Sequence, residues 1–194
     1  VAKRITPGSS KDDLALIEDC DWIIEAIIEK PDIKQDLYRS LGPHLKADAI
    51  VSSNTSTLPL RVLSEGMDDD LVRRFFITHF FNPPRYMRLF EIVAGPVTDP
   101  AMESRVRDFA DAQMGKSVVT AKDTPGFIAN RIGTFWLQAA VTEAFGQGIG
   151  VEEADAVLGR PAGIPRTGIF GLLDLVGLDL MPHILISFDE ALPA

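Results

Sequence analysis

The chain has 194 residues and a formal net charge of −9, because 28 Asp and Glu outnumber 19 Lys and Arg. Hydrophobic residues make up 46 % and charged residues 24 %, which is typical of globular proteins and excludes intrinsic disorder. No stretch approaches about 18 uninterrupted apolar residues, which excludes a membrane span, and the acidic balance argues against nucleic-acid binding.

Apolar runs alternate with helical stretches over the first 122 residues. The runs predict strands at 21–27, 49–53, 75–80, 89–93 and 117–120. One helix is expected to begin at Pro31 and end near 41, and another to begin at Pro100 after Asp99 as its N-cap and to end at Gly115. This alternation predicts parallel βαβ units and an α/β fold.

The composition changes near residue 122. Residues 123–194 contain 3 basic residues against 9 acidic ones, and the turn-forming residues 123–126 precede this part. Helices are expected at 127–145, 151–158, 169–176 and 180–192. The sequence therefore predicts two domains, an α/β domain over 1–122 and an all-helical domain over 123–194.

His79 is the sharpest candidate for chemistry. It comes near the end of an aromatic-rich strand and just before a turn at Pro83 and Pro84. An imidazole titrates near neutrality and can take and return a proton, although a packed core histidine is also consistent with this setting. Glu91 lies within another apolar strand, where a carboxylate is costly unless it is paired. The two predict a His–Glu pair, and the alternative is that Glu91 faces water at a strand end.

Other polar groups follow the predicted strands, at the edge where open parallel sheets bind ligands. Residues 52–57 read SSNTST, and Glu29 and Lys34 follow the first strand. Taken alone, each of these residues is also consistent with a purely structural role in a turn, a helix cap or a solvated helix start. Asn130 is likewise consistent with an ordinary exposed amide. Cys20 is the only cysteine, which excludes an intrachain disulfide and a zinc cluster and favours a reducing, cytoplasmic compartment. No Gly-x-Gly-x-x-Gly loop occurs.

Four motifs together resemble the L-3-hydroxyacyl-CoA dehydrogenase family. They are WIIEAIIE at 22–29, SNTS at 53–56, HFFNP at 79–83 and DTPGFIANR at 123–131, in the order and at the spacing of that family. The resemblance runs from about residue 10 to residue 180. It implies the C-terminal half of a Rossmann-type NAD-binding domain over 1–122 and an incomplete helical dehydrogenase domain over 123–194. The family's Gly-rich loop would lie before Val1.

The resemblance also implies an activity, the NAD-dependent oxidation of an L-3-hydroxyacyl-CoA to the 3-ketoacyl-CoA in fatty-acid β-oxidation. The residues that match the family's catalytic positions are His79, Glu91, Ser56 and Asn130. Those that match positions near the NAD ribose and nicotinamide are Ala26, Glu29, Lys34 and Asn82. No metal is expected.

Partners and alternatives follow from the same resemblance. The expected partners are an acyl-CoA substrate and a second copy bound through the helical domain. The stretch 160–168 is closer to bacterial multifunctional β-oxidation chains than to the short single-function form. A dehydrogenase of another 3-hydroxy acid remains open, as does an inactive CoA-binding or dimerisation fragment. Because the Gly-rich loop is absent, these residues alone are expected to bind NAD poorly.

Overall fold

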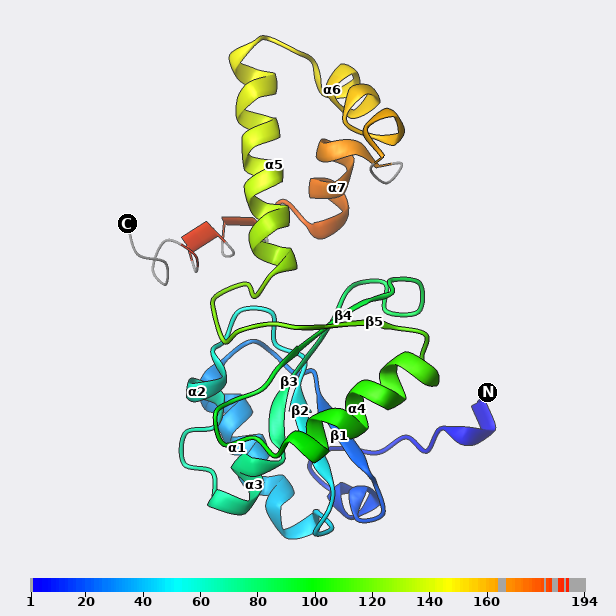
Figure 1. The fold of residues 1–194 in the computed structure, drawn as a ribbon, viewed down its shortest axis with the longest axis vertical. Helices are drawn as coiled ribbons and strands as arrows, with labels where there is room; N and C mark the ends of the chain where they lie inside the picture. Colours follow the sequence, from blue (N-terminus) through cyan, green and yellow to red (C-terminus); the bar gives the residue numbers. More distant parts are fainter. Residues whose placement is uncertain (1, 164–166, 180, 183–184, 187, 189–194) are drawn as a thin grey trace. The chain divides into compact units, whose positions relative to one another are not determined.

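The computed structural model describes residues 2–163, 167–179, 181–182, 185–186 and 188. It divides into two compact units, Val1–Thr124 and Pro125–Ala194. The division falls two residues after the predicted boundary, between Thr124 and Pro125. Figure 1 traces a sheet with flanking helices in the first unit and, among the described residues of the second, helices alone, as the sequence predicted.

The first unit is built on a five-stranded sheet whose order in space, β1-β2-β3-β4-β5, is also the order in the chain. The strands are β1 Trp22–Glu25, β2 Ile50–Ser53, β3 Phe75–Phe80, β4 Leu89–Val93 and β5 Ser117–Thr120. The alternation of strands and helices predicted parallel pairing, and it holds for β1 with β2, β2 with β3 and β4 with β5. The exception is β3 with β4, which pair antiparallel because a short loop rather than a crossover helix joins them.

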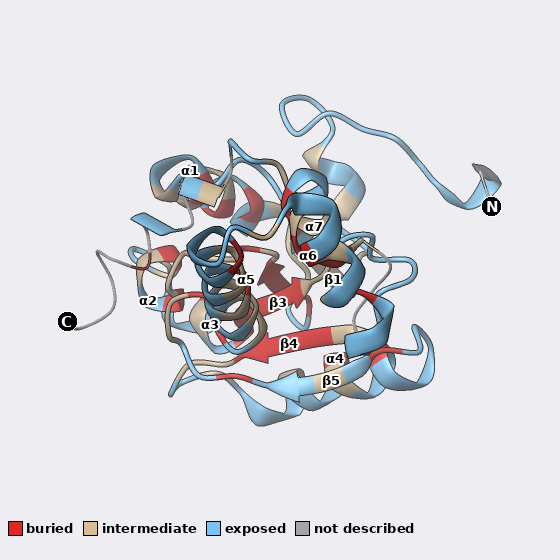
Figure 2. Cartoon of the chain, turned by 90° about the horizontal axis from the view of Figure 1, so that it is seen from above, coloured by how far each residue is buried: buried red, intermediate tan, exposed pale blue. Residues whose placement is uncertain are grey.

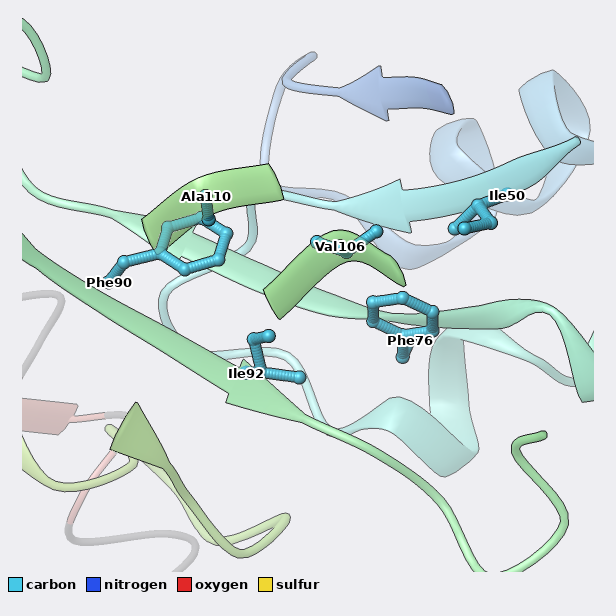
Figure 3. Packing of buried hydrophobic residues seen from close by; sticks show 6 residues of the cluster. All are labelled: Ile50, Phe76, Phe90, Ile92, Val106 and Ala110. Atoms are coloured by element: carbon cyan, nitrogen blue, oxygen red, sulfur yellow. The ribbon is translucent and has the colours of Figure 1, made fainter. Parts of the chain in front are cut away.

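Helices cover both faces of this sheet. They are α1 Pro31–Leu41, α2 Leu60–Leu63, α3 Asp69–Arg73 and α4 Pro100–Ala112, with short 3-10 turns at Ala2–Arg4, Leu14–Ile17 and Gly42–His44. Val106 and Ala110 of α4 lie over the strands in Figure 3 and pack against a cluster of Ile50, Phe76, Phe90 and Ile92. Phe75, which precedes Phe76 in β3, faces the opposite side of the sheet and contacts Tyr38 of α1 with ring centroids 5.0 Å apart.

Local signals explain where α1 and α4 begin. Pro31 and Pro100 occupy the first helical turn, where no backbone N–H is needed. The Asp99 side chain accepts a hydrogen bond from the Ala101 N–H at 2.8 Å, which confirms the predicted N-cap. α2 and α3 were not predicted, because helices of four and five residues show too little periodicity.

Burial is greatest in the middle of the sheet. Figure 2 shows β3 and β4 as buried and the edge strand β5 as largely exposed. Every residue of β3 except Phe80 is buried, and every residue of β4 except Leu89. The central strands therefore provide a water-poor environment for any polar side chain they carry.

The second unit contains α5 Ala129–Gly146, α6 Val151–Val157 and α7 Gly168–Val176, with a 3-10 turn at Arg160–Ala162. Its core is formed by Leu137 of α5 with Ile169 and Leu173 of α7. The long helix was predicted to begin at 127, but Gly126 and Phe127 have φ angles of 68° and 48°, which an α-helix does not accommodate. The helix predicted at 180–192 lies partly outside the described residues. None of the described helices combines the length and hydrophobicity that a membrane crossing requires.

Candidate active site

His79 and Glu91 face each other across the antiparallel strands β3 and β4, which place the two residues in direct register. The imidazole Nδ1 lies 2.8 Å from Glu91 Oε2, so the structure forms the contact that the sequence predicted. His79 is 5 % exposed and Glu91 is 1 % exposed. In such a setting water competes little for the hydrogen bond, and the contact is correspondingly strong.

The pair fixes which imidazole nitrogen can exchange a proton. An ionised carboxylate only accepts hydrogen bonds, so Nδ1 carries the proton that faces Glu91. In a neutral ring with its proton on Nδ1, the lone pair lies on Nε2. A positive charge formed on the ring would be stabilised by the carboxylate beside it.

The Lys116 side chain holds the loop that follows β3 in place. The Lys116 ammonium donates to the Pro84 carbonyl oxygen and, at 2.7 Å, to the Met87 carbonyl oxygen. The Phe81 ring lies 4.4 Å from the His79 ring, measured between centroids. Asn82, one of the predicted cofactor contacts, is exposed in this loop and precedes Pro83 through a cis peptide bond.

Asn54 ties three strand ends together. Its backbone N–H donates to the Glu25 carbonyl oxygen at the end of β1, at 2.7 Å. Its side-chain Oδ1 accepts the Phe80 N–H at the end of β3, at 2.9 Å. Because Phe80 follows His79 directly, Asn54 fixes the loop after β2 relative to the histidine.

A buried carboxylate that the sequence analysis did not single out lies at the end of β1. Glu25 Oε1 accepts the Ile27 N–H and the Lys34 ammonium, each at 2.6 Å. Its Oε2 accepts the Tyr38 and Ser53 hydroxyl groups, also at 2.6 Å. Burial alone would raise the pKa of Glu25, but these four donors outweigh it and hold the pKa below the ordinary value.

The same contacts explain why β1 is shorter than predicted and why Tyr38 is a weak acid. The strand was expected to reach residue 27, but the Glu25 side chain captures the Ile27 N–H and turns the chain. Burial raises the pKa of the Tyr38 phenol, and its hydrogen bond to Glu25 raises it further. A sequence signal for Glu25 existed, since a carboxylate within an apolar strand needs partners.

The predicted cofactor contacts differ in how open they are. Ala26 is exposed at the carboxyl end of β1, and its small side chain leaves the backbone there accessible to a ligand. The Glu29 side chain is 35 % exposed. Lys34 is 1 % exposed, and its ammonium contacts Glu25, Glu29 and the Ile27 carbonyl oxygen, so it acts within the protein interior. Contact of these residues with a cofactor stays a prediction.

Ser56 and Asn130 complete the predicted set. Ser56 lies in the loop after β2, and its backbone N–H donates to Glu29 Oε1 at 3.1 Å. Asn130 is the second residue of α5 and half-buried in the second unit. The structure brings His79, Glu91 and the Ser56 loop to one region of the first unit, and the approach of Asn130 to them stays a prediction.

Comparison with protein families divides the chain at the same place as the structure. Residues 1–124 match the family model described as 3-hydroxyacyl-CoA dehydrogenase, NAD binding domain. Residues 126–194 match the model described as 3-hydroxyacyl-CoA dehydrogenase, C-terminal domain. The two models together cover nearly the whole chain.

Individual proteins give the same result. A Rickettsia felis protein named as a fatty acid oxidation complex trifunctional enzyme is 48 % identical over 98 % of the chain, which spans 26 % of that relative. A Deinococcus radiodurans protein named as a 3-hydroxyacyl-CoA dehydrogenase is 40 % identical over 99 % of the chain, which spans 56 % of it. The crystal structure of (S)-3-hydroxybutyryl-CoA dehydrogenase from Ralstonia eutropha superposes with a TM-score of 0.81 at 28 % identity, over 92 % of this chain and 62 % of that one.

Proposed function

The chain belongs to the 3-hydroxyacyl-CoA dehydrogenase family, and on that basis we propose that the protein oxidises an L-3-hydroxyacyl-CoA to the 3-ketoacyl-CoA with NAD. The observation that carries this proposal is the buried contact of 2.8 Å between His79 Nδ1 and Glu91 Oε2. Oxidation of a secondary alcohol needs a group that accepts the hydroxyl proton, and this pair is built to accept one.

Each catalytic residue has a role that its chemistry allows. His79 Nε2 accepts the hydroxyl proton, and Glu91 stabilises the imidazolium that forms. Ser56 and Asn130 hydrogen-bond the substrate oxygens and orient the reacting carbon. When the hydroxyl is reformed in the reverse direction, the same imidazolium returns its proton.

The residues at the carboxyl ends of β1 to β3 fit the nicotinamide side of NAD, which supplies the hydride acceptor when bound. Ala26 and Asn82 are exposed there, and Glu29 is partly exposed. We propose that these three residues contact the cofactor directly, and that Lys34 contributes through its ion pair with Glu29. That division follows from the burial of the Lys34 ammonium.

The proposal extends to the biological setting. A role in fatty-acid β-oxidation is consistent with the name of the Rickettsia felis relative. Homodimerisation through the helical unit is supported by large apolar side chains that are mostly exposed there, namely Ile132, Phe135, Phe145 and Leu175. A cytoplasmic location is favoured by the single cysteine, Cys20.

The direct test is a steady-state assay of the protein encoded by the complete gene. Reduction of acetoacetyl-CoA should consume NADH, and oxidation of 3-hydroxybutyryl-CoA should produce it. Free 3-hydroxy acids serve as the competing substrates, because the fold and the catalytic pair do not by themselves define the acyl carrier. Turnover of a free acid but not of the CoA ester would reassign the substrate class. No turnover of either would overturn the proposal.

A further inference from the structure

The Glu29 carboxylate fastens the loop that carries Ser56. Its Oε1 accepts the backbone N–H groups of Ser56 at 3.1 Å and Thr57 at 3.3 Å. The same oxygen accepts the hydroxyl groups of Thr55 and Thr57. One carboxylate oxygen thus meets four donors from three consecutive residues, which defines the backbone path on both sides of the serine.

The other oxygen of Glu29 is held by a cation in the protein interior. The Lys34 ammonium lies 3.3 Å from Glu29 Oε2 and 2.6 Å from Glu25 Oε1. Glu25 in turn accepts the Ser53 hydroxyl, whose oxygen accepts the Thr55 N–H at 3.2 Å. Two sets of hydrogen bonds therefore hold the loop: those of Glu29 with residues 55–57, and that of Ser53 with the Thr55 N–H.

We propose that Glu29 is a positioning residue for Ser56, with Lys34 as the cation that aims it, in addition to any contact that Glu29 makes with NAD. The inference deepens the proposed function and rests on it, because it assigns Ser56 a place at the substrate hydroxyl. A serine in a loop of polar residues would otherwise sample several positions, whereas hydride transfer needs the substrate oriented within tight limits.

Substitution by glutamine separates the charge of Glu29 from its shape. A carboxamide has a single acceptor oxygen, so Glu29→Gln cannot offer one oxygen to the loop and another to the Lys34 ammonium. Whichever way it turns, either the Ser56 and Thr57 amides or the ammonium face an N–H group. We expect kcat to fall by about 10- to 100-fold through misplacement of the serine.

The decisive experiment is a double-mutant cycle in the protein encoded by the complete gene. kcat and KM for NAD are measured for the parent, Glu29→Gln, Ser56→Ala and the double variant. If Glu29 acts through Ser56, the double variant has the same kcat as Ser56→Ala alone. The matched control is Asp68→Asn, because Asp68 also accepts a backbone N–H, from Leu71 at 2.7 Å, but caps α3. This variant should leave kcat unchanged.

Two results would overturn the proposal. One is a double variant whose kcat falls by the product of the fold decreases in the two single variants. The other is a higher KM for NAD with kcat unchanged, which would make Glu29 a cofactor contact only. Should Glu29→Gln fail to fold, Glu29→Asp replaces it in the cycle, since it keeps the charge but shortens the reach.

Hydrogen exchange of the Ser56 and Thr57 amides provides a readout that does not depend on activity. Faster exchange in Glu29→Gln, with the Leu71 amide unchanged, supports the positioning role even if the parent turns over no hydroxyacyl-CoA. In that case the proposed function fails while the positioning of the loop stands. Unchanged exchange at both amides overturns the positioning role itself.

Discussion

The first unit buries two carboxylates, and their partners differ in kind. Glu25, at the end of β1, is held by an ammonium group, two hydroxyl groups and a backbone N–H. Glu91, in β4, is held against the imidazole of His79. The partners of Glu25 face it as N–H and O–H donors, whereas an imidazole nitrogen can either donate or accept a hydrogen bond.

That difference separates a structural role from a chemical one. A carboxylate surrounded by permanent donors stabilises one conformation and has no reason to change its charge. A carboxylate beside an imidazole stabilises a charge that appears only when the ring takes a proton. Substitutions at the two sites should accordingly affect different quantities, stability at Glu25 and turnover at Glu91.

The largest effect is expected at His79. In the protein encoded by the complete gene, His79→Gln removes the proposed proton acceptor, so kcat should fall by about 10²- to 10⁴-fold while NAD binding, measured by calorimetric titration, is retained. The control is His44→Gln, because His44 also contacts a carboxylate, Glu18 Oε1 at 3.2 Å, but at the surface. If His79→Gln turns over as fast as the parent protein, the histidine has no part in the mechanism.

Next in size is the loss of stability in Glu25→Gln. This change leaves the buried Lys34 ammonium without its closest counter-ion, which typically costs about 3–5 kcal/mol of unfolding free energy. The folded-state pKa of Glu25 lies below its ordinary value of 4.5. The stabilisation is therefore present at pH 7 and declines as the pH falls below that value towards the folded-state pKa.

Urea unfolding at pH 7 and at pH 4 measures this dependence. The difference in unfolding free energy between the parent protein and Glu25→Gln should be smaller at the lower pH. A second variant, Glu25→Gln with Lys34→Met, should recover part of the lost unfolding free energy because it removes both charges. A difference in unfolding free energy that grows on acidification would contradict the assignment of Glu25 as a stabilising anion.

Glu91→Gln should mainly lower turnover. The carboxamide cannot stabilise the imidazolium as a carboxylate does, and a hydrogen bond to a charged group is worth about 1.5–3 kcal/mol. We expect kcat to fall by about 10- to 100-fold. If Glu91→Gln instead lowers the free energy of unfolding as much as Glu25→Gln does and leaves kcat unchanged, the proposed contrast between the two carboxylates is wrong.

Tyr38→Phe is expected to have the smallest effect. It removes one of the four donors to Glu25 and leaves the Lys34 ammonium in place. The loss should be about 1 kcal/mol of unfolding free energy with kcat unchanged, as determined by urea unfolding and steady-state assays. A loss as large as that of Glu25→Gln would show that the hydroxyl, not the ammonium, dominates the site.

The sequence predicted elements best where the side-chain pattern alone decides them. The strands 75–80 and 89–93 have the predicted ends, because apolar runs bounded by turn residues must be buried. The direction of β4 depends on the short loop that precedes it, and the signal of Pro83 and Pro84 was interpreted only as a turn. The start of α5 depends on the backbone angles at Gly126 and Phe127, which periodicity does not reveal.

The site divides in the same way. The pairing of His79 with Glu91 was predicted because a buried carboxylate needs a partner, and the partner was near in the sequence. The same argument applies to Glu25, but its partners Lys34, Tyr38 and Ser53 come from a helix and a second strand. Such contacts depend on how α1 packs on the sheet, which local sequence does not specify.

The direct register of His79 and Glu91 across β3 and β4 has a consequence for how such a site tolerates insertions and deletions. Residues added to the connecting loop leave the ladder unchanged, so this loop can lengthen or shorten without separating the pair. A single residue inserted within either strand would turn one of the two side chains to the opposite face of the sheet. We therefore expect variation in chain length between these positions to be confined to the loop.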